Sequence, residues 1–186
     1  MKKKVKWRPI ACVDVARYHV NYRDIELPIL KDFGSEHQEK RLKALKDYMV
    51  YMSIARLFKS KSRKKILELL DDCKEEMNYD VKELSARFKG LYSRDSITKS
   101  YVSASKLLWL VNRRIIIMDS FCCKALAVSV DDYGVYRTLW IDKYNEMKNE
   151  VDSAIDEYQQ ICNNRVVSNR WFKKRVFDQY LWSIGR

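Results

Sequence analysis

The fold is organised around one segment of the chain, residues 100–126, which reads SYVSASKLLWLVNRRIIIMDSFCCKAL. Its first half carries apolar residues at helical spacing and predicts a helix that ends where Asn112 and two arginines interrupt the pattern. A second apolar run, 115–118, then leads directly to a single carboxylate, Asp119. An acid that follows four apolar residues needs either hydrogen-bonding partners or a functional role.

Two interpretations of Asp119 follow from its position. In the first, Asp119 is the N-cap of a helix that starts at Ser120, and its carboxylate accepts hydrogen bonds from the first free backbone N–H groups. In the second, Asp119 is the acid of a functional site. The sequence leaves both open.

Few residues in the chain break helices. The 186 residues include four Gly and two Pro, while 47% of residues are hydrophobic and 33% are charged. This composition favours long helices over the many tight turns of a sandwich or barrel. We therefore expect an all-α fold, with residues 10–186 forming a single globular domain of about seven to eight helices behind a basic N-terminal arm, 1–9. Long amphipathic helices are expected at 36–58 and 138–162.

The chain is strongly basic, with 37 Lys and Arg against 25 Asp and Glu and a net charge of +12. A charge of this size favours a polyanionic partner, and we expect nucleic acid, DNA before RNA. Segment 59–65 has no acid, and if Ser62 caps the next helix, three of its cations fall in the first helical turn. The candidate nucleic-acid-binding residues are Lys59, Lys61, Arg63, Lys64, Lys65, Arg113, Arg114, Arg170, Lys173, Lys174 and Arg175.

The last group of these cations alternates with aromatic residues in an expected helix, 168–185. Trp171 and Phe172 lie beside Arg170 and Lys173, a mixture typical of surfaces that contact single strands or flipped bases. The alternative is that the aromatic residues form the core stripe of an ordinary amphipathic helix.

The cysteines do not indicate a metal site. Five are present, at positions 12, 73, 122, 123 and 162, without C-x-x-C spacing and with only two histidines in the chain. We expect reduced thiols, no metal and no cofactor. No apolar stretch approaches the length of a membrane span, so we expect no membrane association and a cytoplasmic location.

The central segment resembles the part of the helix-hairpin-helix DNA glycosylase superfamily that carries its essential aspartate. The resemblance rests on Asp119-Ser120 after an apolar run, followed by Lys124-Ala125-Leu126. Residues 105–109 and 180–182, SKLLW and YLW, are also similar to uncharacterised helical proteins of prophage or defence type. Residues 96–103 contain neither the Gly nor the Pro of the superfamily's hairpin, so a member of this kind would be degenerate.

The resemblance implies hydrolysis of an N-glycosidic bond in DNA. Asp119 would stabilise the positive charge that develops on the sugar or position water, and Lys99 or Lys106 would act as an amine nucleophile. The alternative for both lysines is an ordinary solvated position on a helix.

Two functions therefore remain open. The first is a DNA-binding protein, a degenerate glycosylase acting in prophage or antiviral defence. The second is a non-catalytic interaction subunit of a multi-protein defence complex. In that case the acidic helical segment 146–157 and the basic region 40–65 would be docking surfaces.

Overall fold

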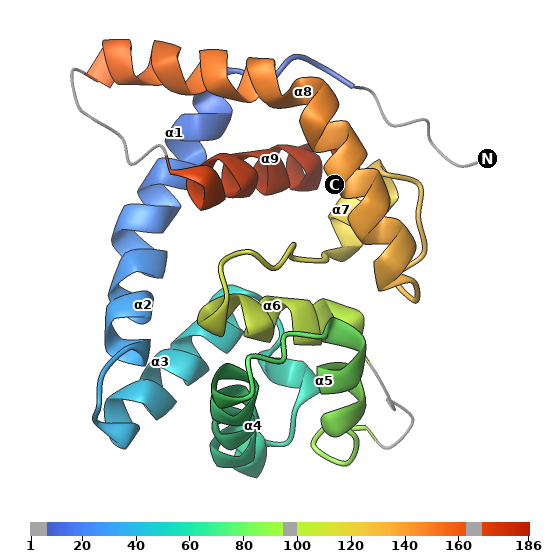
Figure 1. Cartoon of the computed structure of the whole chain (residues 1–186). Helices are drawn as coiled ribbons and strands as arrows, with labels where there is room; N and C mark the ends of the chain where they lie inside the picture. The colour runs from blue at the N-terminus through green and yellow to red at the C-terminus, as the bar shows by residue number, and fades with distance from the viewer. Residues whose placement is uncertain (1–6, 95–99, 163–168) are drawn as a thin grey trace. The chain divides into compact units, whose positions relative to one another are not determined.

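The structure, a computed structural model, describes residues 7–94, 100–162 and 169–186 (Figure 1). Within these ranges the chain forms nine α-helices, one π-helical turn and two 3₁₀ turns. The β-pairing found there is a single isolated antiparallel bridge between Phe58 and Tyr92. The expected all-α fold is confirmed.

The chain is divided into two compact units. Unit 1 comprises Met1–Arg23 and Asp119–Arg186, and unit 2 comprises Asp24–Met118. One of the two crossings between them falls inside a π-helical turn, η1 (Tyr22–Glu26). A single domain over 10–186 stays a prediction, and most of the predicted basic arm lies outside the described residues.

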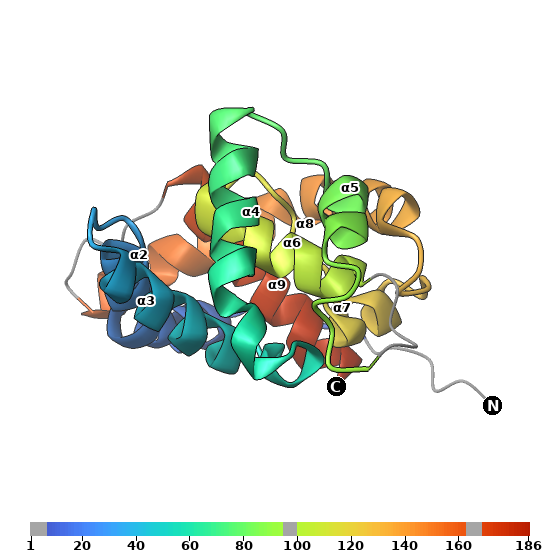
Figure 2. The same cartoon turned by 90° about the horizontal axis from the view of Figure 1, so that it is seen from below.

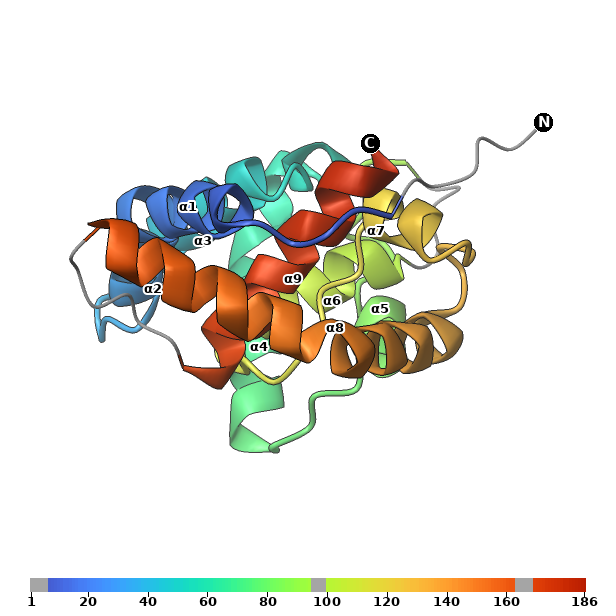
Figure 3. The same cartoon turned by 90° about the horizontal axis from the view of Figure 1, so that it is seen from above.

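Unit 1 contains four helices, α1 (Cys12–Asn21), α7 (Ser120–Ala125), α8 (Tyr133–Cys162) and α9 (Arg170–Gly185). Helix α1 packs along α8 and α9, and α7 packs on α9 (Figure 3). Helix α8 begins five residues before the expected start of 138. The Asp132 carboxylate accepts the N–H of Val135 at 3.0 Å and so caps the helix at this earlier position.

The contact between α7 and α9 is a close approach of two backbones. A Cβ added at Gly185 would lie 2.0 Å from the carbonyl oxygen of Phe121 and 3.2 Å from the backbone nitrogen of Ala125. Beside this point the rings of Phe121 and Trp182 meet edge to face, with centroids 5.6 Å apart. Glycine is therefore required at position 185 by the packing of the two helices.

Unit 2 contains five helices, seen together from below in Figure 2. They are α2 (Leu27–Phe33), α3 (Gln38–Tyr51), α4 (Arg63–Glu75), α5 (Val81–Arg87) and α6 (Tyr101–Val111), with 3₁₀ turns η2 (Ala55–Leu57) and η3 (Ser60–Ser62). Residues 103–110 of α6 are all buried. Among them, Trp109 is 1% exposed and stacks on Tyr48 at a centroid distance of 6.2 Å.

The prediction of a single helix over 36–58 is wrong beyond residue 51, because α3 ends at Tyr51. Ser53 has a positive φ of 57°, and its N–H and that of Ile54 donate to the carbonyls of Val50 and Met49, each at 2.9 Å. This is the Schellman pattern of a helix end. The apolar periodicity continues through 3₁₀ turn η2, which explains why the sequence did not show the break.

Helix α4 ends in an unfavourable backbone conformation. Met77 follows the helix with a φ of 52° and a side chain that is 77% exposed. Glycine adopts this conformation without the steric cost of a Cβ. We expect Met77→Gly to raise the free energy of unfolding by about 0.5–1 kcal/mol in urea denaturation. Met77→Ala is the control and should give no such gain, so an equal gain from both would contradict the explanation.

Candidate nucleic-acid interface

Two segments of unit 2 carry many cations and no acid. Residues 48–67 and 88–94 together contain eight Lys and Arg and no Asp or Glu. Seven of the eight side chains are exposed and that of Arg63 is half-buried. We call this set the basic surface. Its members are Arg56, Lys59, Lys61, Arg63, Lys64, Lys65, Lys89 and Arg94.

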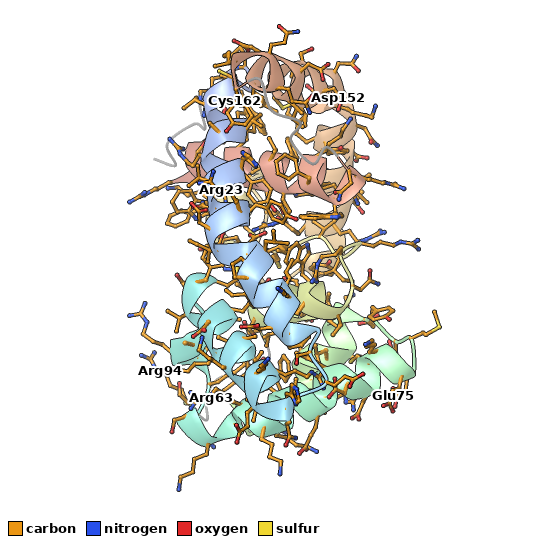
Figure 4. The ribbon with its side chains drawn as sticks, turned by 90° about the vertical axis from the view of Figure 1, so that its left-hand side faces the viewer. Arg23, Arg63, Glu75, Arg94, Asp152 and Cys162 are labelled. Carbon is orange, nitrogen blue, oxygen red and sulfur yellow. The ribbon has the colours of Figure 1, made fainter. Side chains whose placement is uncertain are left out.

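Hydrogen bonds hold the two segments of the basic surface together. The backbone N–H of Lys59 donates to the carbonyl of Leu91 at 2.9 Å, and that of Ser93 donates to the carbonyl of Leu57 at 2.8 Å. The Ser93 hydroxyl also donates to the Arg56 carbonyl at 2.8 Å. Residues about thirty positions apart in the sequence are therefore neighbours, and Figure 4 shows Arg63 and Arg94 on the same edge of unit 2.

An aromatic cluster anchors the paired segments to the core of unit 2. Phe58 contacts Tyr92 and Phe88 at centroid distances of 5.0 and 5.3 Å, and all three rings are at most 5% exposed. Burial raises the pKa of Tyr92, although its hydroxyl hydrogen-bonds with Ser103. These rings fix the backbone from which the cations project.

The N-terminus of α4 lies inside the basic surface. Ser62 occupies the expected N-cap position, but its hydroxyl donates to the carbonyl of Leu91 at 3.1 Å and makes no cap hydrogen bond to the helix. The first turn holds Arg63, Lys64 and Lys65 and contains no acid. Cations here oppose the helix dipole, which favours negative charge at this end. The only described carboxylate that pairs with these three is that of Glu68, 3.1 Å from Lys65 Nζ.

The basic surface accounts for all the excess positive charge of unit 2. The unit contains 20 Lys and Arg and 14 Asp and Glu, so its net charge is +6. Outside the basic surface the same unit has 12 cations and 14 acids, a net charge of −2. The excess positive charge is thus concentrated on two paired segments, which is the pattern expected of a polyanion-binding region.

The other predicted cations of unit 2 lie elsewhere. The Arg113 guanidinium stacks over Trp109, 4.3 Å from the ring centroid, and donates to the Trp109 carbonyl. It lines a cavity of about 580 Å³ together with Phe33, Arg41 and Asp71. Arg114 is exposed. The two arginines are therefore adjacent in the sequence but lie in different surroundings.

The four predicted cations of unit 1 do not form a common surface. Arg170 is exposed, whereas Lys173 pairs with Asp152 at 2.7 Å. Lys174 is half-buried, and burial lowers its pKa. The prediction that Arg175 contacts nucleic acid is corrected here, because this side chain is 4% exposed and ion-paired inside unit 1.

Arg175 belongs to a buried polar cluster with Asp178. One Asp178 oxygen accepts from Arg175 at 3.1 Å, and the other accepts from the indole N–H of Trp140 at 2.8 Å. Burial raises the pKa of Asp178 to about 6, although Arg175 opposes the shift. The Arg175 guanidinium also lies over the ring of Tyr18, 5.5 Å from its centroid.

The aromatic residues of α9 are core residues more than a binding platform. Phe172 is fully buried and packs on Tyr18 at a centroid distance of 5.0 Å. Trp171 is half-buried and meets Tyr22 edge to face at 5.2 Å. The core interpretation of this stripe therefore holds for Phe172.

The three proposed catalytic residues differ in what surrounds them. Asp119 is the N-cap of α7, and its carboxylate accepts the N–H of Phe121 at 2.9 Å, as the capping interpretation expects. Lys106 is 5% exposed, and its ammonium donates to the carbonyl of Met52 at 3.1 Å. The solvated position considered for Lys106 is thus wrong. Lys99 lies outside the described residues, and Lys106 and Asp119 belong to different units.

Sequence reasoning missed three members of the basic surface, namely Arg56, Lys89 and Arg94. Arg56 precedes segment 59–65, and the other two lie in a different part of the sequence. The absence of acids from 48–67 and from 88–94 was a visible signal for both segments. Their pairing was not visible, because it depends on the bridge between Phe58 and Tyr92.

Comparison with protein-family models, with curated proteins and with solved structures finds no match to this chain. Among the described helices, none has both the length and the apolar character needed to cross a membrane. The described residues also contain no group of three or more His, Cys, Asp or Glu side chains arranged to hold a metal ion.

Proposed function

We propose that this protein binds nucleic acid, DNA before RNA, through the basic surface of unit 2. The observation that carries the proposal is the concentration of eight cations, without one acid, on two segments that hydrogen bonds hold side by side. Lys and Arg on such a surface neutralise phosphates and release counterions, which supplies most of the affinity of non-specific binding.

The position of three of these cations on the first turn of α4 also supports the proposal. Arg63, Lys64 and Lys65 stand where the helix dipole disfavours cations, and the N-cap side chain is engaged elsewhere. A phosphate at this position would be favoured by the dipole and the three side chains together. The local cost in the unbound protein would then be removed by binding.

The role we propose is binding without base excision. The Lys106 amine donates to a backbone carbonyl and is almost fully buried, whereas a Schiff-base nucleophile must reach its substrate. Asp119 has a structural role as a helix cap. A role in prophage or antiviral defence stays a proposal that rests on the resemblance alone.

The test is DNA binding by the full chain across a salt series. The variant replaces Arg63, Lys64 and Lys65 with Ala. The matched control replaces Lys40, Lys43 and Lys46 with Ala, which removes the same charge from exposed positions on α3 of the same unit. We expect the first variant to lose about 100-fold in affinity at low salt and to reduce the salt slope by about 2–3, and the control to change little.

Equal losses from both variants would mean that only net charge matters and would contradict a localised interface. If wild type does not bind at low salt, the nucleic-acid proposal fails. The rival function, a protein-interaction subunit, would then be supported. Its docking surface would be the exposed acids of α8, Asp142, Glu146, Glu150, Asp156 and Glu157.

The variant with Arg63, Lys64 and Lys65 replaced by Ala should be more stable than wild type. Removing three cations from the first turn of α4 relieves their repulsion with the helix dipole, a contribution that the lysines of α3 do not share. We expect urea denaturation at low salt to show a gain of about 1 kcal/mol that shrinks as salt screens the dipole. The α3 control should show no gain. A loss of stability in the first variant would mean that these cations make stabilising contacts within the protein.

A further inference from the structure

Resting on the proposed function, we infer that the basic surface binds the sugar-phosphate backbone of duplex DNA and does not bind single strands by base stacking. Single-strand binders combine a positive groove with exposed aromatic rings on which bases stack. The exposure of the aromatic rings on the basic surface therefore distinguishes the two kinds of ligand.

The aromatic residues of the two segments point into the core. Phe58, Phe88 and Tyr92 form the buried cluster beneath the cations, with exposed fractions of 5%, 0% and 1%. Tyr48 is 1% exposed and stacks on Trp109. The remaining ring, that of Tyr51, is half-buried, and its hydroxyl donates to Glu26 at 3.1 Å. None of the five is an exposed platform for a base.

The side chains that do reach solvent are cations. Seven of the eight are exposed, and they project from a backbone that hydrogen bonds and buried rings hold in place. A duplex presents one phosphate charge per about 1.7 Å of axis, about twice the density of one strand of the same duplex. A fixed group of cations gains more from that dense, stiff array than from a flexible strand, whose bases would find no ring to stack on.

The experiment compares duplex and single-stranded DNA at equal phosphate number, using fluorescence anisotropy with the full chain. The probes are a mixed-sequence duplex of about 20 base pairs and an oligo-dT strand of about 40 nucleotides. We expect the duplex to bind at least about 10-fold more tightly near 0.1 M salt. The affinities of duplexes that differ in sequence should agree within about 3-fold.

The variant with Arg63, Lys64 and Lys65 replaced by Ala identifies the surface involved. Support for the inference requires that the duplex preference of wild type shrinks in this variant and persists in the α3 control. Oligo-dT binding as tightly as the duplex would overturn the inference while leaving nucleic-acid binding intact. Failure of wild type to bind either probe would instead overturn the proposed function.

Discussion

Replacing Arg175 with Leu is expected to lower the free energy of unfolding by about 3–5 kcal/mol near pH 8. The substitution leaves the Asp178 carboxylate buried in unit 1 without its cation. The hydrogen bond from Trp140 remains, but a neutral donor does not offset the cost of burying the charge. Chemical denaturation measures the effect. The control is Arg170→Leu, an equal change of charge at an exposed position of the same helix, and should stay within about 0.5 kcal/mol of wild type.

The loss should be much smaller near pH 5. Burial raises the folded-state pKa of Asp178 to about 6 from an ordinary value of 3.8. Between these values the folded protein binds a proton that the unfolded chain has released, so the contribution of Asp178 to stability falls as pH rises through this range. Without Arg175 the pKa of Asp178 rises further, and near pH 5 the carboxyl is neutral. A loss of equal size at both pH values would mean that Asp178 does not depend on Arg175.

Gly185→Ala is expected to destabilise the protein by about 2–3 kcal/mol. The added Cβ would lie 2.0 Å from the carbonyl oxygen of Phe121, and no side-chain rotation relieves a clash with backbone. The last turn of α9 must then move away from α7, which separates Trp182 from Phe121. Urea denaturation checks the free energy of unfolding.

Gly34→Ala is the matched control for this substitution. The nearest atoms to a Cβ at Gly34 are backbone oxygens at 3.5 and 3.6 Å, an ordinary contact distance. Its φ of −78° suits any residue, so we expect no loss and a gain of up to about 1 kcal/mol. Similar results for the two glycines would show that the approach of α7 and α9 imposes no constraint.

Local signals in the sequence predicted the helices well where capping residues mark their ends. Asp80 opens α5 by accepting the N–H groups of Lys82 and Glu83, as its capping-box spacing indicates, and Asp119 opens α7. The end of α3 was missed because it depends on the backbone conformation of Ser53, a residue with no special preference for a positive φ. Helix ends without glycine give a weak sequence signal.

The sequence predicted part of the candidate site. The acid-free run 59–65 identified five of the eight cations, because local charge density needs no knowledge of the fold. Arg175 was assigned wrongly, since four cations among aromatic residues do not reveal which one faces inward. The sequence did contain a signal that Arg175 is ion-paired, because Asp178 lies three residues further along the same helix, at the spacing of an ion pair. The pairing of distant segments requires the tertiary structure.

The uneven distribution of tryptophan provides an optical probe of each unit. Four of the five tryptophans belong to unit 1, whereas Trp109, which contacts Tyr48 and the Arg113 guanidinium, is the sole indole of unit 2. In a chain whose other indoles are replaced by Phe, fluorescence would follow unit 2 alone, while circular dichroism would follow both units. Coincident melting curves would identify one cooperative structure, and separated curves would show that the halves unfold in sequence.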